Sequence, residues 1–176
     1  MNIFFIGREH LDDYCSPIKS AQQLCDKHVV KMVLETAQMC STTMHNWHSL
    51  PDNMLDYPTD LLENIYKPAY QNHPMTKWVG YLRCNMLWAL QHGLAIGEEY
   101  RYRYDKDHSS TVILQKMKDY MEYMGWWLES DRHTEPPQCM PDEYKCDDYV
   151  EAYRNYYREG KAHILKWTNR EKPEWI

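Results

Sequence analysis

The chain has 176 residues, which is long enough for one domain with a buried core. Its 20 basic and 26 acidic residues give a formal net charge of −6. This charge argues against a protein that coats nucleic acid or anionic membrane nonspecifically, because such binding depends on neutralising phosphates. A local basic groove is still compatible with this net charge.

Six cysteines occur, none in a Cys-x-x-Cys pair, and the sequence shows no signal-peptide pattern. We therefore expect reduced, mostly buried thiols in a cytoplasmic protein. No apolar run approaches the ~20 residues that span a membrane, so no membrane partner is expected. The aromatic residues are mostly Tyr (15) and Trp (7); we expect most to pack helix faces, and some could stack on bases.

The hydrophobic pattern predicts an all-α fold, a compact helical bundle in which residues 1–176 form one domain. Residues 2–6 are a short apolar run, predicted as one strand or an extended segment on the core. Apolar positions recur at helical spacing over residues 19–47, which predicts one long helix. Residues 49–60 contain Pro, Asp and Asn, and are predicted as a loop.

A second long helix is predicted to start at Pro74 and to end near Asp105. Proline is favoured in the first turn of a helix, and Asn72 or His73 is expected to cap it.

The remaining third of the chain is predicted to hold a helix, a loop and a helical end. Residues 109–122 have helical spacing, residues 130–146 are rich in proline and charge, and residues 147–167 are predicted as a C-terminal helix or helix pair.

The clearest chemical pattern is residues 26–35, Asp-Lys-His-Val-Val-Lys-Met-Val-Leu-Glu. On a helix, Lys31 lies about 60° and Glu35 about 20° to one side of His28. These three side chains border the buried stripe, where the pKa of a titratable group can shift. Such a trio suits acid/base catalysis or attack by an amine. The alternative is an ordinary Lys31–Glu35 surface ion pair, contributing about 0.3 kcal/mol, beside a half-buried histidine.

Residues 26–35 resemble the first-helix motif of the phage endonuclease V family of pyrimidine-dimer DNA glycosylases. There an Asp-x-His-apolar-apolar stretch precedes the catalytic glutamate at the same spacing. Residues 70–78, which begin Tyr-Gln-Asn-His-Pro, are similar to the Tyr-Arg-Asn-His-Pro segment of the bacterial relatives, and the order of elements also matches. The chain further resembles a group of small phage proteins that share Asp-Lys-His-Val-Val-Lys-Met and Met-Pro-Asp-Glu-Tyr-Lys.

The resemblance implies chemistry on a pyrimidine nucleotide flipped out of the base stack. In the family, an N-terminal amine attacks C1′ of the sugar, a glutamate assists proton transfer, a Schiff base forms, and β-elimination can cut the strand. By position, Glu35 would be the catalytic carboxylate and His28 a contact or proton-transfer residue. The nucleophile would be the amine of Met1 or of Lys31. An α-amine suits this role because its ordinary pKa, about 7.7–8, is below that of a lysine. No cofactor is implied.

Several cations alternate with aromatic residues, a pattern that suits contact with phosphates and stacking on bases. For residues 101–106 the alternative is a polar helix end whose cations complement the helix dipole. From these patterns and the resemblance, the predicted substrate- or DNA-binding residues are Asn2, Gln38, Asn72, His73, Lys77, Arg101, Arg103, Lys106, Tyr144, Lys145, Lys166 and Trp167.

His45 and His48 are spaced i,i+3, which could invite a metal ion. No matching Cys/His pair lies at structural-zinc spacing, so we expect a solvated helix end and no metal.

We therefore expect a DNA N-glycosylase, with or without abasic-site lyase activity, acting on a damaged or modified pyrimidine in DNA or in a nucleotide. Two alternatives remain open: a phage transferase that modifies a DNA base in the same pocket, and a non-enzymatic acidic module that binds a nucleotide or a host protein. We expect a monomer or small homo-oligomer in the cytoplasm, that of the host if a phage encodes it.

Overall fold

The computed structural model describes residues 1–8, 14–49, 59–126 and 132–176. These residues form helices and extended segments, and no strand occurs among them, which confirms the predicted all-α class. The described helices are α1 (Pro17–Gln23), α2 (Asp26–His48), α3 (Thr59–Glu63), α4 (Pro74–Tyr81), α5 (Arg83–Tyr104), α6 (Ser109–Tyr123) and α7 (Tyr149–Asn155), with the short turns η2 (Asp142–Tyr144), η3 (Tyr156–Gly160) and η4 (Ala162–Ile164).

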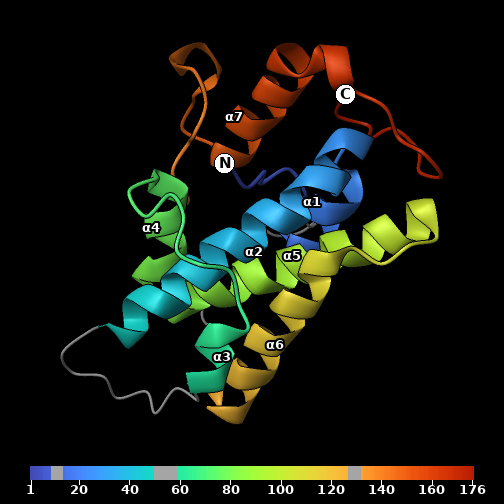
Figure 1. Cartoon of the computed structure of the whole chain (residues 1–176). Helices are drawn as coiled ribbons and strands as arrows, with labels where there is room; N and C mark the ends of the chain where they lie inside the picture. The colour runs from blue at the N-terminus through green and yellow to red at the C-terminus, as the bar shows by residue number, and fades with distance from the viewer. Residues whose placement is uncertain (9–13, 50–58, 127–131) are drawn as a thin grey trace.

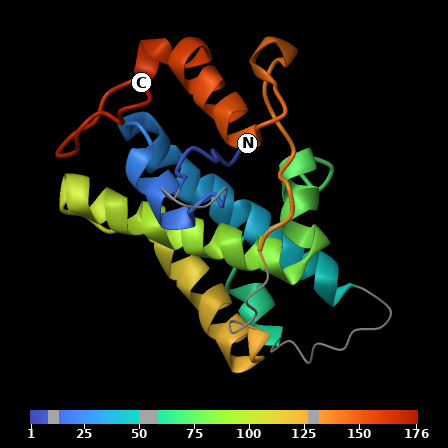
Figure 2. The same cartoon turned by 180° about the vertical axis from the view of Figure 1, so that it is seen from behind.

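The two long helices α2 and α5 pack against each other at the centre of the molecule (Figure 1). Helix α6 contacts both of them, α1 packs on α5, and α4 packs on α2. The N-terminal segment lies between α2 and α7, as the view from behind also shows (Figure 2). This placement brings the first residues of the chain onto the middle of α2.

Residues 2–7 are buried in an extended conformation, so the predicted apolar run packs on the core without forming a strand. The next residue, Arg8, forms an isolated bridge with Cys15. The N–H of Gly7 is satisfied instead by the Ser20 hydroxyl, at 3.0 Å. Buried backbone groups must find partners, and here helix α1 supplies one.

The predicted helix 19–47 is two helices, because the backbone is extended at Leu24 and Cys25. Pro17 opens α1 after Ser16, whose hydroxyl accepts the N–H of Lys19. The interruption frees backbone groups that distant elements satisfy. The carbonyl of Leu24 accepts a guanidinium N–H from α5, and the N–H of Cys25 donates to a tyrosine hydroxyl of η3.

The second predicted helix is also divided, at Leu82, where φ is −137° and ψ is 154°. Its start is as expected: His73 caps α4 by accepting the N–H of Met75, and Pro74 follows. The buried Asn85 side chain donates to the carbonyl of Trp78, one of the groups that the break leaves free.

The helix predicted over 109–122 is confirmed as α6, which His108 caps. The predicted C-terminal helix is shorter than expected: α7 ends at Asn155, continues as the π-helical turn η3, and then gives way to η4 and an extended tail. Most of the predicted loop 49–60 lies outside the described residues, and α3 begins at its end.

The six cysteines, all within the described residues, form no disulfide: Cys15, Cys25, Cys40 and Cys84 are buried, Cys139 is half-buried and Cys146 is exposed. None of the helices in the described ranges is long and apolar enough to cross a membrane.

Candidate functional site

The centre of the candidate site is the carboxylate of Glu35, which lies against the first two residues of the chain. The amine of Met1 is 3.8 Å from Glu35 Oε2, and the backbone N–H of Asn2 donates to the same oxygen at 2.9 Å. Lys31 Nζ is 3.0 Å from Oε1. Glu35 is only 8% exposed. The structure therefore joins three of the predicted catalytic residues, Met1, Lys31 and Glu35, at one carboxylate.

The side chain of Asn2 fixes the N-terminal segment in this position. Its amide donates to the carbonyl of Cys139 at 3.0 Å, and its Oδ1 accepts the N–H of Ile3 at 2.9 Å and the hydroxyl of Tyr153 at 3.2 Å. Tyr153 is fully buried on α7, and the single proton of its hydroxyl is shared between Asn2 Oδ1 and the carbonyl of Pro137, which is 2.8 Å away. Asn2 is thus a structural link between four segments, a role that differs from the substrate contact predicted for it.

Helix α4 brings its first turn to the same place. The Thr76 hydroxyl is 3.7 Å from Met1 Sδ. The pKa of His73 is lowered, first by burial and then by the charge of the N-terminal amine, while Glu35 acts in the opposite direction. His73 is therefore close enough to both groups to sense their charges. The amine and Cys139 are coupled in the same way, since the amine opposes the burial that raises the pKa of this thiol.

His28 is buried below this site, and its imidazole is part of the packing. Phe4 stacks on it at 4.4 Å between ring centroids, and its Nδ1 lies 2.7 Å from the hydroxyl of Tyr157. Burial, followed by the charges of Lys161 and Lys31, lowers the pKa of His28 from 6.5 to about 3. A neutral imidazole cannot act as an imidazolium acid at neutral pH, so the predicted proton-transfer role is limited to a hydrogen bond from the ring.

The Tyr157 hydroxyl that contacts His28 also accepts the backbone N–H of Cys25 at 3.0 Å. It therefore links the imidazole to the start of α2.

Asp26, the first residue of the motif, anchors the C-terminal tail. Its carboxylate accepts the N–H and the hydroxyl of Thr168 at 2.9 and 2.8 Å, and its backbone N–H donates to the carbonyl of Lys166. These bonds, with the neighbouring Arg103 ion pair, hold the pKa of Asp26 below its ordinary value against the opposing effect of burial. The motif therefore combines a structural carboxylate at its start with the Glu35 carboxylate nine residues later, about 13 Å along the helix.

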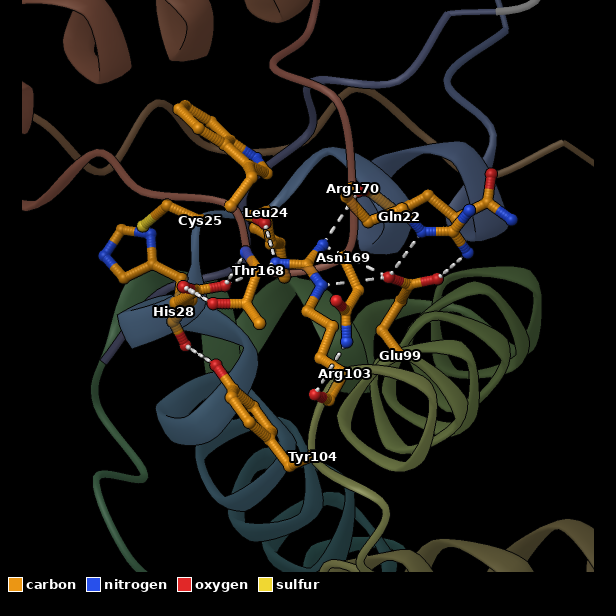
Figure 3. A network of polar contacts seen from close by, with 12 residues as sticks. Gln22, Leu24, Cys25, His28, Glu99, Arg103, Tyr104, Thr168, Asn169 and Arg170 are labelled. Atoms are coloured by element: carbon orange, nitrogen blue, oxygen red, sulfur yellow. Dashed lines mark hydrogen bonds and ion pairs between the residues drawn. The ribbon is translucent and has the colours of Figure 1, made fainter.

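Arg103 belongs to this anchor, which corrects its predicted role in binding DNA (Figure 3). Its side chain is fully buried, donates to the carbonyls of Leu24 and Gln22, and pairs with Asp26 and Glu99. All the donors of this guanidinium face protein groups, so it cannot contact a phosphate in this structure.

The tail closes over the same cluster. Arg170 pairs with both oxygens of Glu99, and the amide of Asn169 donates to the carbonyl of Arg103. Trp167, predicted to stack on a base, donates its indole N–H to the carbonyl of Gln23 at 3.0 Å. It is half-buried and holds the tail on α1.

The other predicted binding residues lie in separate places. Arg101 is exposed and paired with Asp107, and Lys106 is exposed beyond the end of α5. The remaining ones are Gln38 on α2, Asn72 and Lys77 at the start of α4, Tyr144 and Lys145 in and after η2, and Lys166 in the tail.

Of these residues, Lys77 and Gln38 lie one helical turn from His73 and Glu35. Lys77 is exposed one turn after His73, and Gln38 is half-buried one turn after Glu35. Lys145 pairs with Asp142, and Tyr144 packs beside Tyr156 at 5.2 Å between ring centroids. The structure therefore gathers a smaller set of the predicted residues around Glu35 than the sequence patterns proposed.

No metal site is formed by the described residues, among which no three His, Cys, Asp or Glu side chains come together in a suitable group. His45 instead contacts the carbonyl of Tyr66 at 3.1 Å. No family model matches the chain, and no curated protein or solved structure matches it.

Proposed function

We propose that the chain is a DNA-base-directed N-glycosylase that uses the N-terminal amine as its nucleophile and Glu35 as its acid/base group. One observation carries this proposal: the amine of Met1 lies 3.8 Å from the carboxylate of a nearly buried glutamate. An amine nucleophile needs a nearby base to take the proton that it sheds on attack. The 3.8 Å between the amine and Glu35 Oε2 supports Glu35 in this role.

Exposure of the main chain of Met1 supports the proposal. The side chain of Met1 is only 2% exposed, yet the residue as a whole is half-buried, so the solvent-accessible part of Met1 is its main chain. If Met1 were removed, the new amine of Asn2 would lie 2.9 Å from the same oxygen, so Glu35 would serve either N-terminus.

The proposed reaction begins with attack by the neutral amine on C1′ of the sugar. The glycosidic bond breaks, its electron pair leaves with the base, and the base takes up a proton from water. Glu35 accepts the proton that the attacking nitrogen releases and returns it to the ring oxygen as the sugar opens to a Schiff base. Water then hydrolyses the Schiff base, or loss of a C2′ proton expels the 3′ phosphate and cuts the strand.

Lys31 is the competing nucleophile within the same site. Its side chain is 63% exposed and its Nζ is the nearest ammonium group to Glu35. The Met1 amine is favoured because buried hydrogen bonds hold the segment that carries it, whereas Lys31 extends from an exposed helix position. Holding reacting groups in place is a large part of catalysis.

A second function is favoured by the completeness of the Glu35 contacts. Both carboxylate oxygens have partners, which is also what a structural anchor for the N-terminus requires. In that case the protein would be a binding module without base chemistry.

Replacing Glu35 by Gln separates the two functions. As a glycosylase, the E35Q protein should lose at least about 100-fold in base release from ultraviolet-irradiated DNA and in cleavage of abasic DNA. The matched control is E143Q, since Glu143 is exposed in η2; it should keep full activity. Full activity of a folded E35Q protein would exclude the proposed role of Glu35.

A further inference from the structure

A hollow of about 620 Å³ lies between helix α1, helix α7 and the C-terminal tail. This volume is within the range of about 300–1,000 Å³ that is typical of ligand sites. We call it the tail hollow, and its lining comes from four separate parts of the described chain, namely residues 8, 19–23, 154 and 171–175. The lining includes none of the residues proposed to act with Glu35, so the tail hollow is a second and separate candidate site.

The lining of the tail hollow carries more cations than acids. Its charged residues are the cations Arg8, Lys19, Arg154 and Lys172 and the acids Glu171 and Glu174. Both acids are exposed, whereas the side chains of Arg8 and Arg154 are only 27% and 16% exposed. Water and salt screen partly buried charges less than exposed ones. The inner part of the hollow therefore has a positive potential, although the chain as a whole has a net charge of −6.

Two carboxylates of the described chain pair with three guanidinium groups beside the hollow. Arg8 Nη2 donates to both oxygens of Asp148, at 2.7 and 2.8 Å. Glu151 lies 2.8 Å from Arg158 Nη2 but 3.6 Å from Arg154 Nη1. Arg154 is therefore the guanidinium of the three whose carboxylate contact is longest, and its charge is the least compensated by protein groups.

The guanidinium of Arg154 is held in place and still has donors to offer. Its Nε donates to the carbonyl of Ile6 at 3.0 Å, and its Cζ lies 5.3 Å from the centroid of the Trp175 ring. Among the described residues, no hydrogen bond involves its two terminal nitrogens, and neither nitrogen is enclosed by protein. Burial lowers the pKa of Arg154, Glu151 opposes this shift and Arg8 adds to it, so an anion in the hollow would stabilise the charged form.

We propose that the tail hollow binds a phosphate group, carried by a mononucleotide or by a nucleic-acid strand, and that Arg154 is its main contact. The terminal nitrogens of a guanidinium bind two phosphate oxygens as a fork. Phosphate has more acceptor oxygens than carboxylate, so it can also reach cations from the other lining segments. Lys172 is one of these, because it is exposed and pairs with no carboxylate of the described chain. The indole of Trp175 beside Arg154 offers an aromatic surface to the attached sugar or base.

Calorimetric titration at fixed salt concentration tests this site with three ligands: thymidine 5′-monophosphate, uncharged thymidine, and the tetranucleotide of thymidine. The proteins are the wild type, R154Q, K172A, E174Q and K67A. The K172A and E174Q substitutions change exposed side chains, so they test the site even if R154Q disturbs the fold. K67A is the matched control for K172A, because Lys67 is an exposed lysine between α3 and α4 and does not line the hollow.

We expect the wild type to bind the monophosphate at least about tenfold more tightly than thymidine. R154Q should lose most of this preference. K172A should weaken binding of the monophosphate about threefold, E174Q should strengthen it about threefold, and K67A should leave it unchanged. Equal binding of the monophosphate and thymidine by the wild type would overturn the proposal, and so would an effect of K172A no larger than that of K67A.

The tetranucleotide identifies the source of the phosphate. Tighter binding of the tetranucleotide than of the monophosphate, weakened in R154Q, would support a site for a nucleic-acid strand. Preference for the monophosphate, also weakened in R154Q, would support a site for a free nucleotide. If neither affinity changes in a folded R154Q protein, the tail hollow is not the phosphate site. These titrations make and break no covalent bond, so their outcome does not depend on the chemistry proposed at Glu35.

Discussion

The hydroxyl of Tyr157 lies 2.7 Å from Nδ1 of His28, although the two residues are 129 positions apart in the chain. Both residues are buried, and the same hydroxyl accepts the N–H of Cys25 where the first long helical pattern is interrupted. One hydroxyl therefore holds both the imidazole of His28 and the start of α2. It also connects the π-turn to the helix that carries Glu35.

Replacing Tyr157 by Phe should destabilise the fold by about 1–3 kcal/mol, because a buried N–H and a buried imidazole nitrogen lose their partner. Urea unfolding measures the change. Y123F is the control, since Tyr123 is 83% exposed, and it should stay within about 0.5 kcal/mol of the wild type. An equal effect of the two substitutions would show that the hydroxyl contributes nothing to stability.

Stability should fall with decreasing pH below about 6.5. The pKa of His28 is about 3 in the folded chain and that of buried His92 is about 4, against an ordinary value of 6.5. Between these values the unfolded chain binds protons that the folded chain does not, so the contribution is complete above pH 6.5 and is lost toward pH 3–4. Each histidine contributes a slope of up to about 1.4 kcal/mol per pH unit.

The H28Q protein shows how much of this pH dependence of stability is due to His28. Its unfolding free energy, measured by urea titration from pH 7 to about pH 4, should decline less steeply than that of the wild type. An identical slope in the two proteins would mean that His28 is not held neutral by the fold.

Replacing Arg103 by Ala should cost about 3–5 kcal/mol of stability, because the half-buried Asp26 carboxylate and the buried Glu99 carboxylate lose their shared cation. Arg101, two residues earlier on the same helix, is the matched control: its pair with Asp107 is exposed, and R101A should cost less than about 1 kcal/mol. Chemical denaturation compares the two. A small loss of stability in R103A together with weaker DNA binding would instead support the DNA-binding role that the sequence pattern predicted for Arg103.

The Tyr153 hydroxyl should hold the N-terminal segment through Asn2. In Y153F the bond to Asn2 Oδ1 is lost, so backbone amides of residues 3–6 should exchange hydrogen about five- to tenfold faster, as expected for about 1 kcal/mol. Mass spectrometry measures the rate of hydrogen exchange in this segment directly. Y144F, which alters a half-buried tyrosine of η2, should not change it; unchanged exchange in Y153F would show that Asn2 is held by its other contacts.

Local signals in the sequence predicted the helices but not their interruptions. The His-Pro start of α4 and the spacing of α6 are encoded within a few residues, and both were predicted correctly. The breaks at residues 24–25 and at Leu82 involve no glycine or proline. They are stabilised by partners far along the chain, including the Arg103 guanidinium and the Tyr157 hydroxyl.

In the candidate site, too, the sequence predicted local contacts but not those made by distant residues. The spacing of Lys31 and Glu35 on one helix was sufficient to predict that they meet. The position of the Met1 amine depends on the packing of an extended segment under α7, which no local pattern encodes. Arg103 resembles an exposed cation in the sequence because its two carboxylate partners and the tail that covers them are assembled only in the fold.

The proposed function depends on which nitrogen forms the covalent intermediate. Borohydride reduction of the protein on DNA with an abasic site traps a Schiff base, and peptide mapping by mass spectrometry then locates the attached sugar. Three variants accompany the wild type: E35Q, K31A, and a protein with two added residues before Met1, which moves the α-amine away from Glu35.

We predict an adduct on the N-terminal amine that persists in K31A and is lost in the extended protein and in E35Q. An adduct on Lys31 would contradict the assignment of the nucleophile. The absence of any adduct from the wild type would contradict amine catalysis and leave Glu35 as an anchor of the N-terminus.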